Sequence, residues 1–299
     1  MTEKNKIKKL ITHSGSFHAD DVFASAVLSL VFEKEGQEFE IIRTRDEEVI
    51  KTGDVVFDVG GVYDESINRF DHHQKGGAGK RENGIEYSSF GLVWKKFGPI
   101  LSSQEEMMII DARLAAPVDA ADNGMDIIEK KYDIFPYAIQ EFFRVMRPAL
   151  IEPDLGMDEM FKEGVSIARK ILEREMIYAK DAVLAKKAIL DIYENTEDKR
   201  VLVFDKNYHS AEVLEKMKET LFVVYPREDG NFGVKAIRKD MDSFENRKNL
   251  PESWAGLKGE DLERVSGVPG AIFCHRALFM ASAKTKEGAI MLANLALKN

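Results

Sequence analysis

Short apolar runs alternate with segments of helical spacing along the first third of the chain. Residues 7–12, 39–43 and 55–59 are short and rich in β-formers, whereas residues 20–32 repeat their apolar side chains at helical spacing. Short buried strands separated by helices are typical of a parallel sheet covered by helices. We therefore predict an α/β fold with a parallel sheet and flanking helices for this part.

The rest of the chain predicts further helices and a second set of strands. Residues 89–97, 105–114 and 135–146 have helical patterns, and residues 157–193 form a long helical stretch rich in Ala, Lys, Glu and Ile. Strands are predicted at 200–204, 221–225, 233–237 and 271–274, and a last helix at 286–297. We expect a first domain over 1–156, a bridging helical segment over 157–195, and a smaller α/β domain over 196–299.

Length and charge narrow the classes of protein. A chain of 299 residues exceeds the size at which single cores tend to split, so two domains are expected. Hydrophobic residues make up 44% and charged residues 32%, which is typical of a folded globular protein. The net charge of −9 argues against a protein that coats duplex nucleic acid. It does not exclude a nucleic-acid enzyme, because bound divalent cations can supply local positive charge.

The single cysteine and the hydropathy bear on location. Cys274 has no partner cysteine for an internal disulfide, which favours a reducing compartment, and no apolar run approaches the length of a membrane span. We expect a cytoplasmic protein with no membrane partner. The long stretch at 157–193 is equally compatible with domain bridging and with a homodimer.

Two imidazoles and two carboxylates crowd into nine residues after the first predicted strand. They are His13, His18, Asp20 and Asp21, at a predicted strand-to-helix turn. Imidazole nitrogens and carboxylate oxygens suit cations such as Mn²⁺, Fe²⁺, Co²⁺ or Zn²⁺, and a turn lets several of them point into one space. The alternative for either aspartate alone is that it caps the following helix.

Two further motifs follow the next strand. Asp58 ends an apolar strand and is followed by Val-Gly-Gly, which by itself is more often only a turn. Asp71, His72 and His73 form an Asp-His-His-Gln motif, in which neighbouring histidines would point in opposite directions on an extended chain. One could ligate a metal while the other faces a phosphate, and Asp71 could hold a histidine tautomer. The alternative is a pair of surface histidines.

A fourth motif carries two more carboxylates. Asp119 and Asp122 are three residues apart, in the sequence Val-Asp-Ala-Ala-Asp-Asn-Gly, and would share one face of a helix. One could be a metal ligand and the other a cap, and Asn-Gly alone is an ordinary turn signal. Together the four motifs hold enough ligands for two cations, which can clamp the attacking and leaving oxygens of a displacement at phosphorus. A structural zinc would more often use cysteines.

The order of these motifs resembles that of the DHH phosphoesterase superfamily, and more closely the MYG exonuclease family. The order is H-x(4)-H-x-D-D, then D-V-G-G, D-H-H-Q and D-A-A-D-N-G, and later segments such as Ser-Trp-Ala-Gly-Leu at 253–257 are also similar. The resemblance covers nearly the whole chain. It implies a DHH-type catalytic domain, a smaller domain that closes over the substrate, and 3′-to-5′ exonuclease activity on RNA or short single-stranded nucleic acid.

The resemblance also assigns roles to residues. It implies two Mn²⁺ or Mg²⁺ ions, with Asp58 as the bridging ligand, and His18 stands where many superfamily relatives have an aspartate. Asp58, His72 and His73 are the expected catalytic residues, with His73 on the scissile phosphate, and Asp71 and Asp119 are expected to support the ligands. The expected metal ligands are His13, His18, Asp20, Asp58, His72 and Asp122.

The last third of the chain adds candidate substrate contacts. The glycine-rich turn at 267–270 leads to His275, and Arg276 and Lys284 follow. Backbone amides and cations there could bind a nucleic-acid backbone or terminal phosphate, and the alternative is a turn into a buried strand. His275, Arg276 and Lys284, together with His73, are the predicted substrate-binding residues.

Two other functions fit the same motifs. A phosphatase or pyrophosphatase acting on small nucleotides could use the same metals, and a closed pocket with an arginine clamp would favour it. A long groove with aromatic stacking positions would favour a polymer. A non-catalytic protein that binds metal or nucleotide would require a broken ligand set, and His18 is the visible departure.

Overall fold

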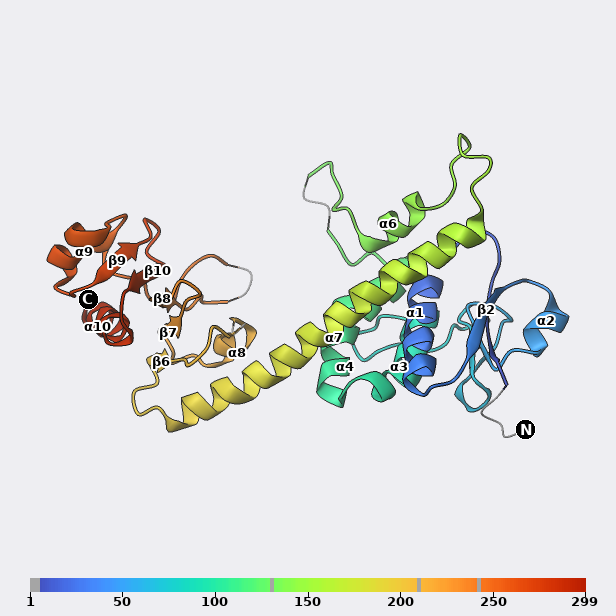
Figure 1. Cartoon of the computed structure of the whole chain (residues 1–299), viewed down its shortest axis with the longest axis horizontal. Coiled ribbons are helices and arrows are strands. Elements are labelled where there is room, and N and C mark those ends of the chain that lie inside the picture. Colours follow the sequence, from blue (N-terminus) through green and yellow to red (C-terminus); the bar gives the residue numbers. More distant parts are fainter. Residues whose placement is uncertain (1–5, 130–131, 209–210, 241–242) are drawn as a thin grey trace. The chain divides into compact units, whose positions relative to one another are not determined.

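The structure is a computed structural model that describes residues 6–129, 132–208, 211–240 and 243–299. The chain divides into two compact units, unit 1 (Met1–Lys180) and unit 2 (Asp181–Asn299). The boundary falls within α7 (Met157–Asn195), so one helix contributes to both units (Figure 1).

Unit 1 is built on a five-stranded sheet in the order β2-β1-β3-β5-β4. Its strands are β1 (Lys8–Thr12), β2 (Phe39–Arg43), β3 (Val55–Phe57), β4 (Tyr63–Asp64) and β5 (Arg69–Phe70). The sheet is parallel across β2, β1, β3 and β5, as predicted, and β4 adds an antiparallel edge. All three residues of β3 are buried, which explains its continuous apolar sequence.

Helices surround this sheet and bury a common core. α1 (Ala19–Lys34) packs against α3 (Ser89–Leu101), and their aromatic rings stack at Phe23 and Phe90, with centroids 5.0 Å apart. α1 is buried along most of its length, so its sequence is apolar on nearly every face rather than amphipathic. Two short helices, α2 (Glu47–Lys51) and η2 (Glu65–Ile67), lie in the connections.

A continuous helical segment follows α3. It consists of α4 (Gln104–Ile110), the π-helical turn η3 (Asp111–Ala115) and α5 (Ala116–Asp122). The helix predicted at 105–114 therefore runs on to Asp122, because the wider π turn continues the helical path instead of ending it. Single π turns inside α-helices are frequent at functional sites.

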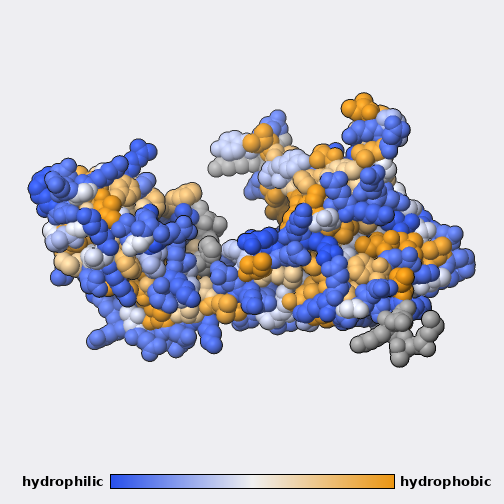
Figure 2. Space-filling model, viewed as in Figure 1, coloured by the Kyte–Doolittle hydropathy of each residue, from blue (hydrophilic) through white to orange (hydrophobic). Residues whose placement is uncertain are grey.

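α6 (Ile139–Val145) starts later than predicted. The predicted helix at 135–146 was wrong over residues 135–138, because Phe135 precedes Pro136 and the residue before a proline is biased away from the helical region. Hydrophobic side chains gather around α6 and the loops on either side of it (Figure 2). The most exposed of them are Ile134, Phe135, Tyr137, Leu150 and Ile151.

The first part of α7 completes the core of unit 1, where Phe161, Ala168 and Leu172 are buried. Beyond Lys180 the same helix buries Ala185 and Ile189 against Leu202 of unit 2. Each half therefore has an apolar face that matches the unit to which it belongs, which accounts for a helix of 39 residues without an internal stop.

Unit 2 has its own five-stranded sheet, in the order β6-β7-β8-β10-β9. Only β6 and β7 are parallel, and the remaining pairs are antiparallel. The strands are β6 (Val201–Val203), β7 (Phe222–Pro226), β8 (Phe232–Ala236), β9 (Ala271–Cys274) and β10 (Met280–Ala283). The helical elements are α8 (Ala211–Lys216), η4 (Glu252–Trp254), α9 (Gly259–Ser266) and α10 (Lys286–Lys298).

The predicted α/β class is confirmed, and the elements that the sequence did not predict are short or weakly patterned. β10 has the sequence Met-Ala-Ser-Ala, which lacks β-branched and aromatic residues, and α9 buries only Leu262. Within the described residues, no helix combines the length and the apolar character that crossing a membrane requires.

Candidate metal centre

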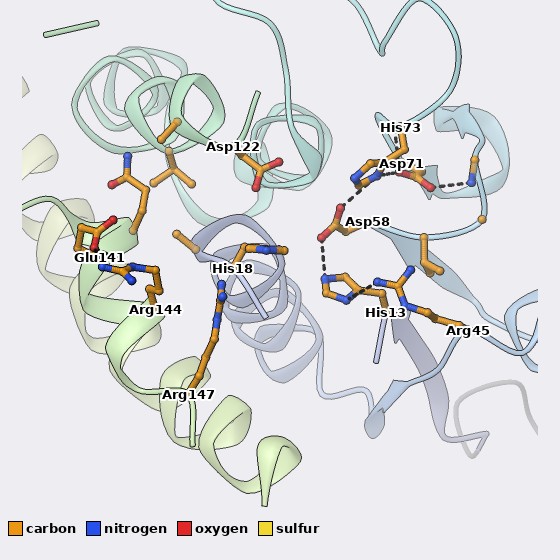
Figure 3. Close-up of a pocket in the computed structure, with 17 residues that line it drawn as sticks. His13, His18, Arg45, Asp58, Asp71, His73, Asp122, Glu141, Arg144 and Arg147 are labelled. Atoms are coloured by element: carbon orange, nitrogen blue, oxygen red, sulfur yellow. Dashed lines mark hydrogen bonds and ion pairs between the residues drawn. The ribbon is translucent and has the colours of Figure 1, made fainter. Parts of the chain in front are cut away.

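Acidic and imidazole side chains meet at one edge of the unit 1 sheet (Figure 3). His13 follows β1, Asp58 follows β3, and His72 follows β5, so one residue of the cluster lies just beyond the end of each of three strands. Parallel strands bring their carboxyl ends to the same edge, where open α/β sheets bind ligands. Two helix ends complete the cluster with Asp20, Asp21 and Asp122.

Asp58 stands at the centre of this cluster. Its Oδ2 lies 3.2 Å from Nε2 of His13, and its Oδ1 lies 3.5 Å from Nε2 of His72 and 3.5 Å from Nδ1 of His73. Its backbone has φ of 56°, a left-handed conformation that is uncommon outside glycine and that clusters at functional sites. Burial raises the pKa of Asp58, but its contacts with the two buried histidines outweigh burial and lower the pKa to about 2.

Asp20 is buried, and Nε2 of His72 approaches its Oδ2 only to 4.0 Å, beyond hydrogen-bond distance. Its side chain has no exposed surface, and neither carboxylate oxygen has a hydrogen-bond partner among the described residues. Burial raises the pKa of Asp20 well above its usual value, and repulsion from Asp58 and Asp122 adds to it. A buried carboxylate is normally paired, hydrogen-bonded or bound to a cation. The donor set therefore fits a divalent cation, which would satisfy the orphaned oxygens.

Asp21 has a different set of partners from its neighbour. Its Oδ1 accepts the backbone N–H of His18 at 2.8 Å, which caps α1, and its Oδ2 lies 3.2 Å from Nε2 of His13. The capping alternative thus holds for Asp21 and not for Asp20. Burial lowers the pKa of His13, but its contacts with Asp21 and Asp58 outweigh burial and raise the pKa to about 10.

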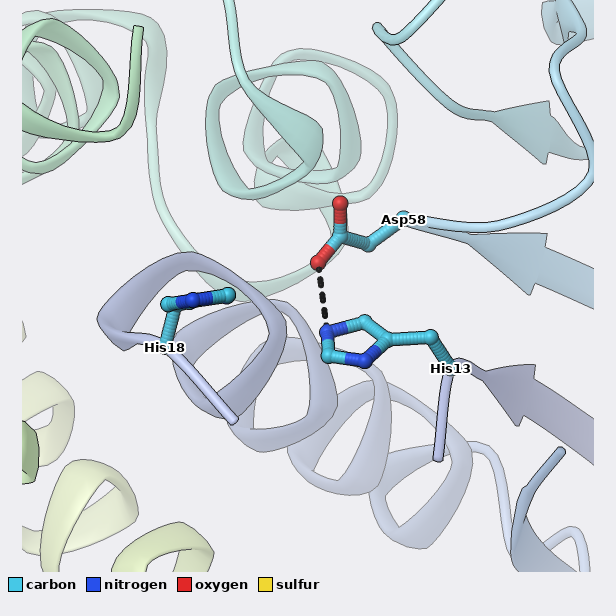
Figure 4. Close-up of side chains that lie close together, drawn as sticks. All are labelled: His13, His18 and Asp58. Carbon is cyan, nitrogen blue, oxygen red and sulfur yellow. Dashed lines mark ion pairs between the residues drawn. The ribbon is translucent and has the colours of Figure 1, made fainter. Parts of the chain in front are cut away.

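His13 and His18 converge on Asp58 from two sides of the turn (Figure 4). Nδ1 of His13 is 3.2 Å from the carbonyl oxygen of Ser14 and 3.3 Å from Nη2 of Arg45, and these two contacts hold the ring with Nε2 toward Asp21 and Asp58. His18 is exposed, and its ring centroid lies 5.7 Å from that of His13.

Ligand atoms of these residues are close enough to share ions. Four overlapping groups of three have one ligand atom of each member within 4.8 Å of the others: His13-His18-Asp58, Asp58-His72-His73, His18-Asp20-Asp122 and Asp20-Asp21-Asp58. Asp58 belongs to three of these groups, which fits a carboxylate placed between two ions. His18 belongs to two of them, so the departure from an aspartate at this position retains a donor atom at the cluster.

His72 is buried and held by a residue that the motifs did not single out. Its Nε2 lies 3.1 Å from Oδ2 of Asp122, and its Nδ1 is 3.2 Å from Oδ1 of Asn123. Asn123 in turn donates its Nδ2 to the carbonyl oxygen of Asp119 at 2.9 Å. The amide therefore fixes the ring so that Nε2 faces the carboxylates. From the sequence, Asn-Gly at this position indicates only a turn.

His73 is exposed and oriented by Asp71. The side chain of His73 is 63% exposed, and its Nδ1 is 2.7 Å from Oδ1 of Asp71. Asp71 also accepts the backbone N–H groups of Gly61, at 2.6 Å, and of His72, at 2.7 Å. A buried carboxylate thus joins the turn after β3 to the histidine pair. The two histidines differ in burial, but they do not point in opposite directions as expected for an extended chain, because both rings approach Oδ1 of Asp58 at 3.5 Å and their centroids lie 4.3 Å apart.

Asp119 and Asp122 both lie on α5 but contact different partners. Oδ1 of Asp119 accepts from Oγ of Ser88 at 2.6 Å and from the backbone N–H of Gly91 at 3.0 Å, and its Oδ2 is 2.8 Å from Nη2 of Arg81. Burial raises the pKa of Asp119 to about 6, against the opposing attraction of Arg81. The structure thus separates Asp119 from the groups that could hold a metal and includes Asp122 in them.

The predicted substrate contacts of the last third lie in unit 2. His275 follows β9, and its Nδ1 accepts the backbone N–H of Ala277 at 3.0 Å, so its Nε2 is left to donate. Arg276 and Lys284 are exposed on either side of β10. Lys284 lies beside Gly270, whose φ is 76°.

A pocket of about 630 Å³ opens over the metal centre within unit 1. Three arginines that sequence reasoning did not assign line it: Arg45, from the turn after β2, and Arg144 and Arg147, from α6 and the turn that follows it. Arg45 had a signal, because it belongs to the segment Thr-Arg-Asp at 44–46, which also resembles a segment of the MYG family. The arginines of α6 had none, because a single charge on a surface helix is ordinary.

Comparisons with known proteins agree with these motifs. The family model MYG1_exonuc, described as "Uncharacterised protein family (UPF0160)", matches residues 9–297. The chain is 30% identical to the MYG1 exonuclease of Homo sapiens over 96% of this chain and 85% of that protein. It is 31% identical to the MYG1 protein of Chlamydia muridarum over 96% of each chain.

Among solved structures, RecJ of Thermus thermophilus in complex with Mn²⁺ is similar at a TM-score of 0.30 and 12% identity. The match covers 98% of this chain and 52% of that one, so the chain spans about half the length of that RecJ.

The α/β fold and the cluster of carboxylates and imidazoles are those of a hydrolytic enzyme of the nuclease and phosphoesterase class. Within that class the chain belongs to the MYG1 exonuclease family. The family expected from the order of the motifs is thereby confirmed.

Proposed function

We propose that this protein is a divalent-metal-dependent phosphodiester hydrolase that removes nucleotides from the 3′ end of RNA or short single-stranded nucleic acid. The observation that carries the proposal is Asp20, whose two buried carboxylate oxygens have no hydrogen-bond partner among the described residues and lie beside Asp58 and Asp122. An unpaired buried charge destabilises the folded state, and a bound cation removes this penalty by pairing with the carboxylate.

Each ligand has a proposed role that its contacts support. His13, Asp20, Asp58, His72 and Asp122 would hold two Mn²⁺ or Mg²⁺ ions, with Asp58 between them and His18 as a further donor. When bound, such ions lower the pKa of the attacking water and offset charge on the phosphate oxygens. Ser14 and Asn123 hold the Nδ1 atoms of His13 and His72, so that both Nε2 atoms face the carboxylates.

His73 is proposed to contact the scissile phosphate. Its Nδ1 is bonded to Asp71, and its ring lines the pocket, so Nε2 is the atom left for the substrate. Asp71 keeps the ring in one orientation through a carboxylate that the backbone of Gly61 and His72 also fixes. A ring held in this way loses little conformational freedom when substrate binds.

Unit 2 is proposed to bind the nucleic-acid strand without contributing metal ligands. Its candidates are His275, Arg276 and Lys284, and the free Nε2–H of His275 can donate to a phosphate oxygen. If this division holds, His275→Ala should raise the KM for oligonucleotides and leave bound metal unchanged. Loss of metal in this variant, or unchanged cleavage of oligonucleotides, would contradict the division.

The test of the function is cleavage of 5′-labelled and 3′-labelled oligonucleotides, with RNA and DNA in parallel and with Mn²⁺, Mg²⁺ or EDTA. We expect single nucleotides to be released from the 3′ end of RNA in Mn²⁺ and no cleavage in EDTA. Asp58→Asn is the inactive control. Cleavage that persists in EDTA, or in Asp58→Asn, would contradict a metal-dependent mechanism at this site.

A phosphatase of small nucleotides is the second candidate, and one observation favours it. The pocket over the metal centre has a volume of about 630 Å³, which lies in the range for small-molecule sites, and three arginines line it. Turnover of nucleoside monophosphates at a higher kcat/KM than oligonucleotides would select this alternative.

A further inference from the structure

Arginine and carboxylate side chains line the same pocket of unit 1 but come from different elements. The carboxylates come from strand ends, α1 and α5, whereas Arg144 and Arg147 come from α6 and the turn that follows it (Figure 3). Guanidinium groups would repel a bound metal cation, so a pocket that held metal ions alone would not be expected to carry arginines on its wall. Their presence calls for a second, anionic group in the bound ligand.

Arg147 is anchored in a way that leaves its terminal nitrogens available. Its Nε donates to the carbonyl oxygen of Phe17 at 2.7 Å, and its guanidinium lies 5.9 Å from the Phe17 ring centroid. It forms no ion pair with a carboxylate in the part of the chain that the structure describes. Burial lowers the pKa of Arg147, and the attraction of Asp21, which is stronger than the repulsion from Arg144, only partly opposes this fall. This is a partly buried cation without its own counterion.

Arg144 has a counterion that an anion can replace. Its Nε donates to Oε2 of Glu141 at 2.8 Å, and both side chains line the pocket. The pair is well exposed, with 62% of the Arg144 side chain and 43% of the Glu141 side chain accessible. Exposed ion pairs contribute little to stability, so a bound phosphate could take Arg144 from Glu141 at small cost.

We propose that Arg147 and Arg144 bind a phosphate group of the substrate other than the phosphate that is hydrolysed. The inference rests on the proposed function, in which the scissile phosphate lies at the metal centre. A guanidinium binds phosphate oxygens through two parallel hydrogen bonds, and the buried carboxylates would repel a second phosphate that no cation compensates. The preferred substrate is therefore a short oligonucleotide with an additional phosphate near the cleaved bond, rather than a simple monoester.

Dinucleotides of one sequence, with a 5′-phosphate, a 3′-phosphate or no terminal phosphate, test the site on the full chain. KM and kcat are measured in Mn²⁺, and binding is measured by calorimetry in EDTA, where hydrolysis does not interfere. We expect a terminal phosphate to lower KM by about 10- to 100-fold, as for hydrogen bonds to charged groups. The arm with the larger effect identifies the end that the arginines bind.

The variants separate this site from the metal centre. Arg147→Gln should remove most of the discrimination through KM, and Arg147→Lys should retain part of it, because a lysine keeps the charge but not the paired donors. Hydrolysis of bis(p-nitrophenyl) phosphate, which has one phosphate, should lose less than hydrolysis of the dinucleotide with a terminal phosphate. Arg169→Gln is the matched control, since Arg169 pairs with Glu33 away from the pocket.

Two outcomes overturn the proposal. One is a terminal phosphate that changes neither KM nor binding in the wild-type chain. The other is discrimination that survives when Arg144 and Arg147 are both replaced by Gln in a folded variant. If no substrate is hydrolysed but the terminal phosphate still improves binding through Arg147, the proposed function fails and the anion site stands.

Discussion

Asp20 and Asp119 are both fully buried aspartates of unit 1, but their surroundings differ in kind. Asp119 receives hydrogen bonds from Ser88 and Gly91 and an ion pair from Arg81, so its charge is compensated within the fold. Among the described residues, Asp20 receives no hydrogen bond on its carboxylate oxygens and only a 4.0 Å approach from Nε2 of His72. A buried carboxylate with its own cation is satisfied within the fold, whereas one without such a partner is open to a ligand from outside.

A glycine allows the close packing around Asp119, and no glycine has this role at Asp20 among the described residues. A Cβ atom on Gly91 would lie 1.8 Å from Oδ2 of Asp119, so the backbone of α3 can approach the carboxylate only because no side chain is present. Around Asp20 the neighbours are instead other acids and imidazoles. The difference separates a carboxylate that is satisfied within the fold from one that we propose serves the reaction.

The largest expected effect is on catalysis by Asp58. Asp58→Asn should lower turnover by at least about 1,000-fold, because a carboxylate between two ions serves both of them. The variant should still fold, because Asn tolerates the left-handed backbone at this position, but its unfolding midpoint in EDTA should fall modestly because His13 and His72 lose a charged partner. Steady-state rates at matched Mn²⁺ and thermal unfolding check both expectations. Near-normal turnover would mean that Asp58 only forms a turn.

Substitution at the Asp119–Arg81 pair should lower the free energy of unfolding and leave metal binding unchanged. Arg81→Gln leaves Asp119 buried without its cation, and breaking a buried pair in this way costs about 3–5 kcal/mol of unfolding free energy. Chemical denaturation measures the loss. Bound Mn²⁺ per folded molecule should be unchanged, because neither Arg81 nor Asp119 belongs to the groups that could hold a metal. Loss of metal without loss of stability would reverse the roles assigned to the two sites.

The two histidines after β5 should separate metal binding from turnover. His72→Ala should lower both metal content and turnover, because Nε2 of His72 faces Asp58 and Asp122. His73→Ala should lower turnover by about 100-fold, in the range for a positioned acid or base, and spare the metal. Metal analysis of the purified variants decides between them. Equal metal loss in both would mean that the two rings share the ligand role.

The smallest expected effect is a pH-dependent change in how much Arg81→Gln destabilises the protein, through the titration of Asp119. Burial raises the pKa of Asp119 to about 6 in the folded chain, above its usual value. The folded state then binds more protons than the unfolded state between about pH 4 and pH 6, so the contribution of Asp119 to stability increases as pH falls through this window.

Removing Arg81 takes away an attraction that opposes this rise, so the window extends to higher pH in Arg81→Gln. The stability deficit of this variant relative to the wild type should therefore shrink between pH 7.5 and pH 5. Denaturation curves of both proteins at the two pH values measure it. A deficit that stays constant or grows on acidification would show that Asp119 is not the group responsible.

Much of the cluster could be predicted because strand ends are visible in the sequence. His13 and Asp58 directly follow apolar strands, and parallel strands bring their ends to one edge. His72 was predicted from the neighbouring histidine pattern, and the structure places it in the same cluster. Their roles as ligands remain predictions, but their proximity followed from topology alone.

Other parts depend on contacts that no local pattern encodes. Asn123 reaches His72 across 51 positions of sequence, and Arg147 reaches the carbonyl of Phe17 across 130. The π turn at η3 continues a helix without an obvious signal in its residues. Such features arise from packing between distant segments, which hydrophobic periodicity does not report.

The central claim is that the uncompensated carboxylates hold divalent cations, and anomalous scattering from crystals grown with Mn²⁺ tests it most directly. The account predicts peaks within about 2.5 Å of carboxylate oxygens of Asp20 and Asp58, with no peak at Asp119. Loss of those peaks in Asp58→Asn, with Asp119 unchanged, would strengthen the assignment. Crystals at saturating Mn²⁺ with no peak at Asp20 and Asp58, or with the ion bound at Asp119, would contradict it.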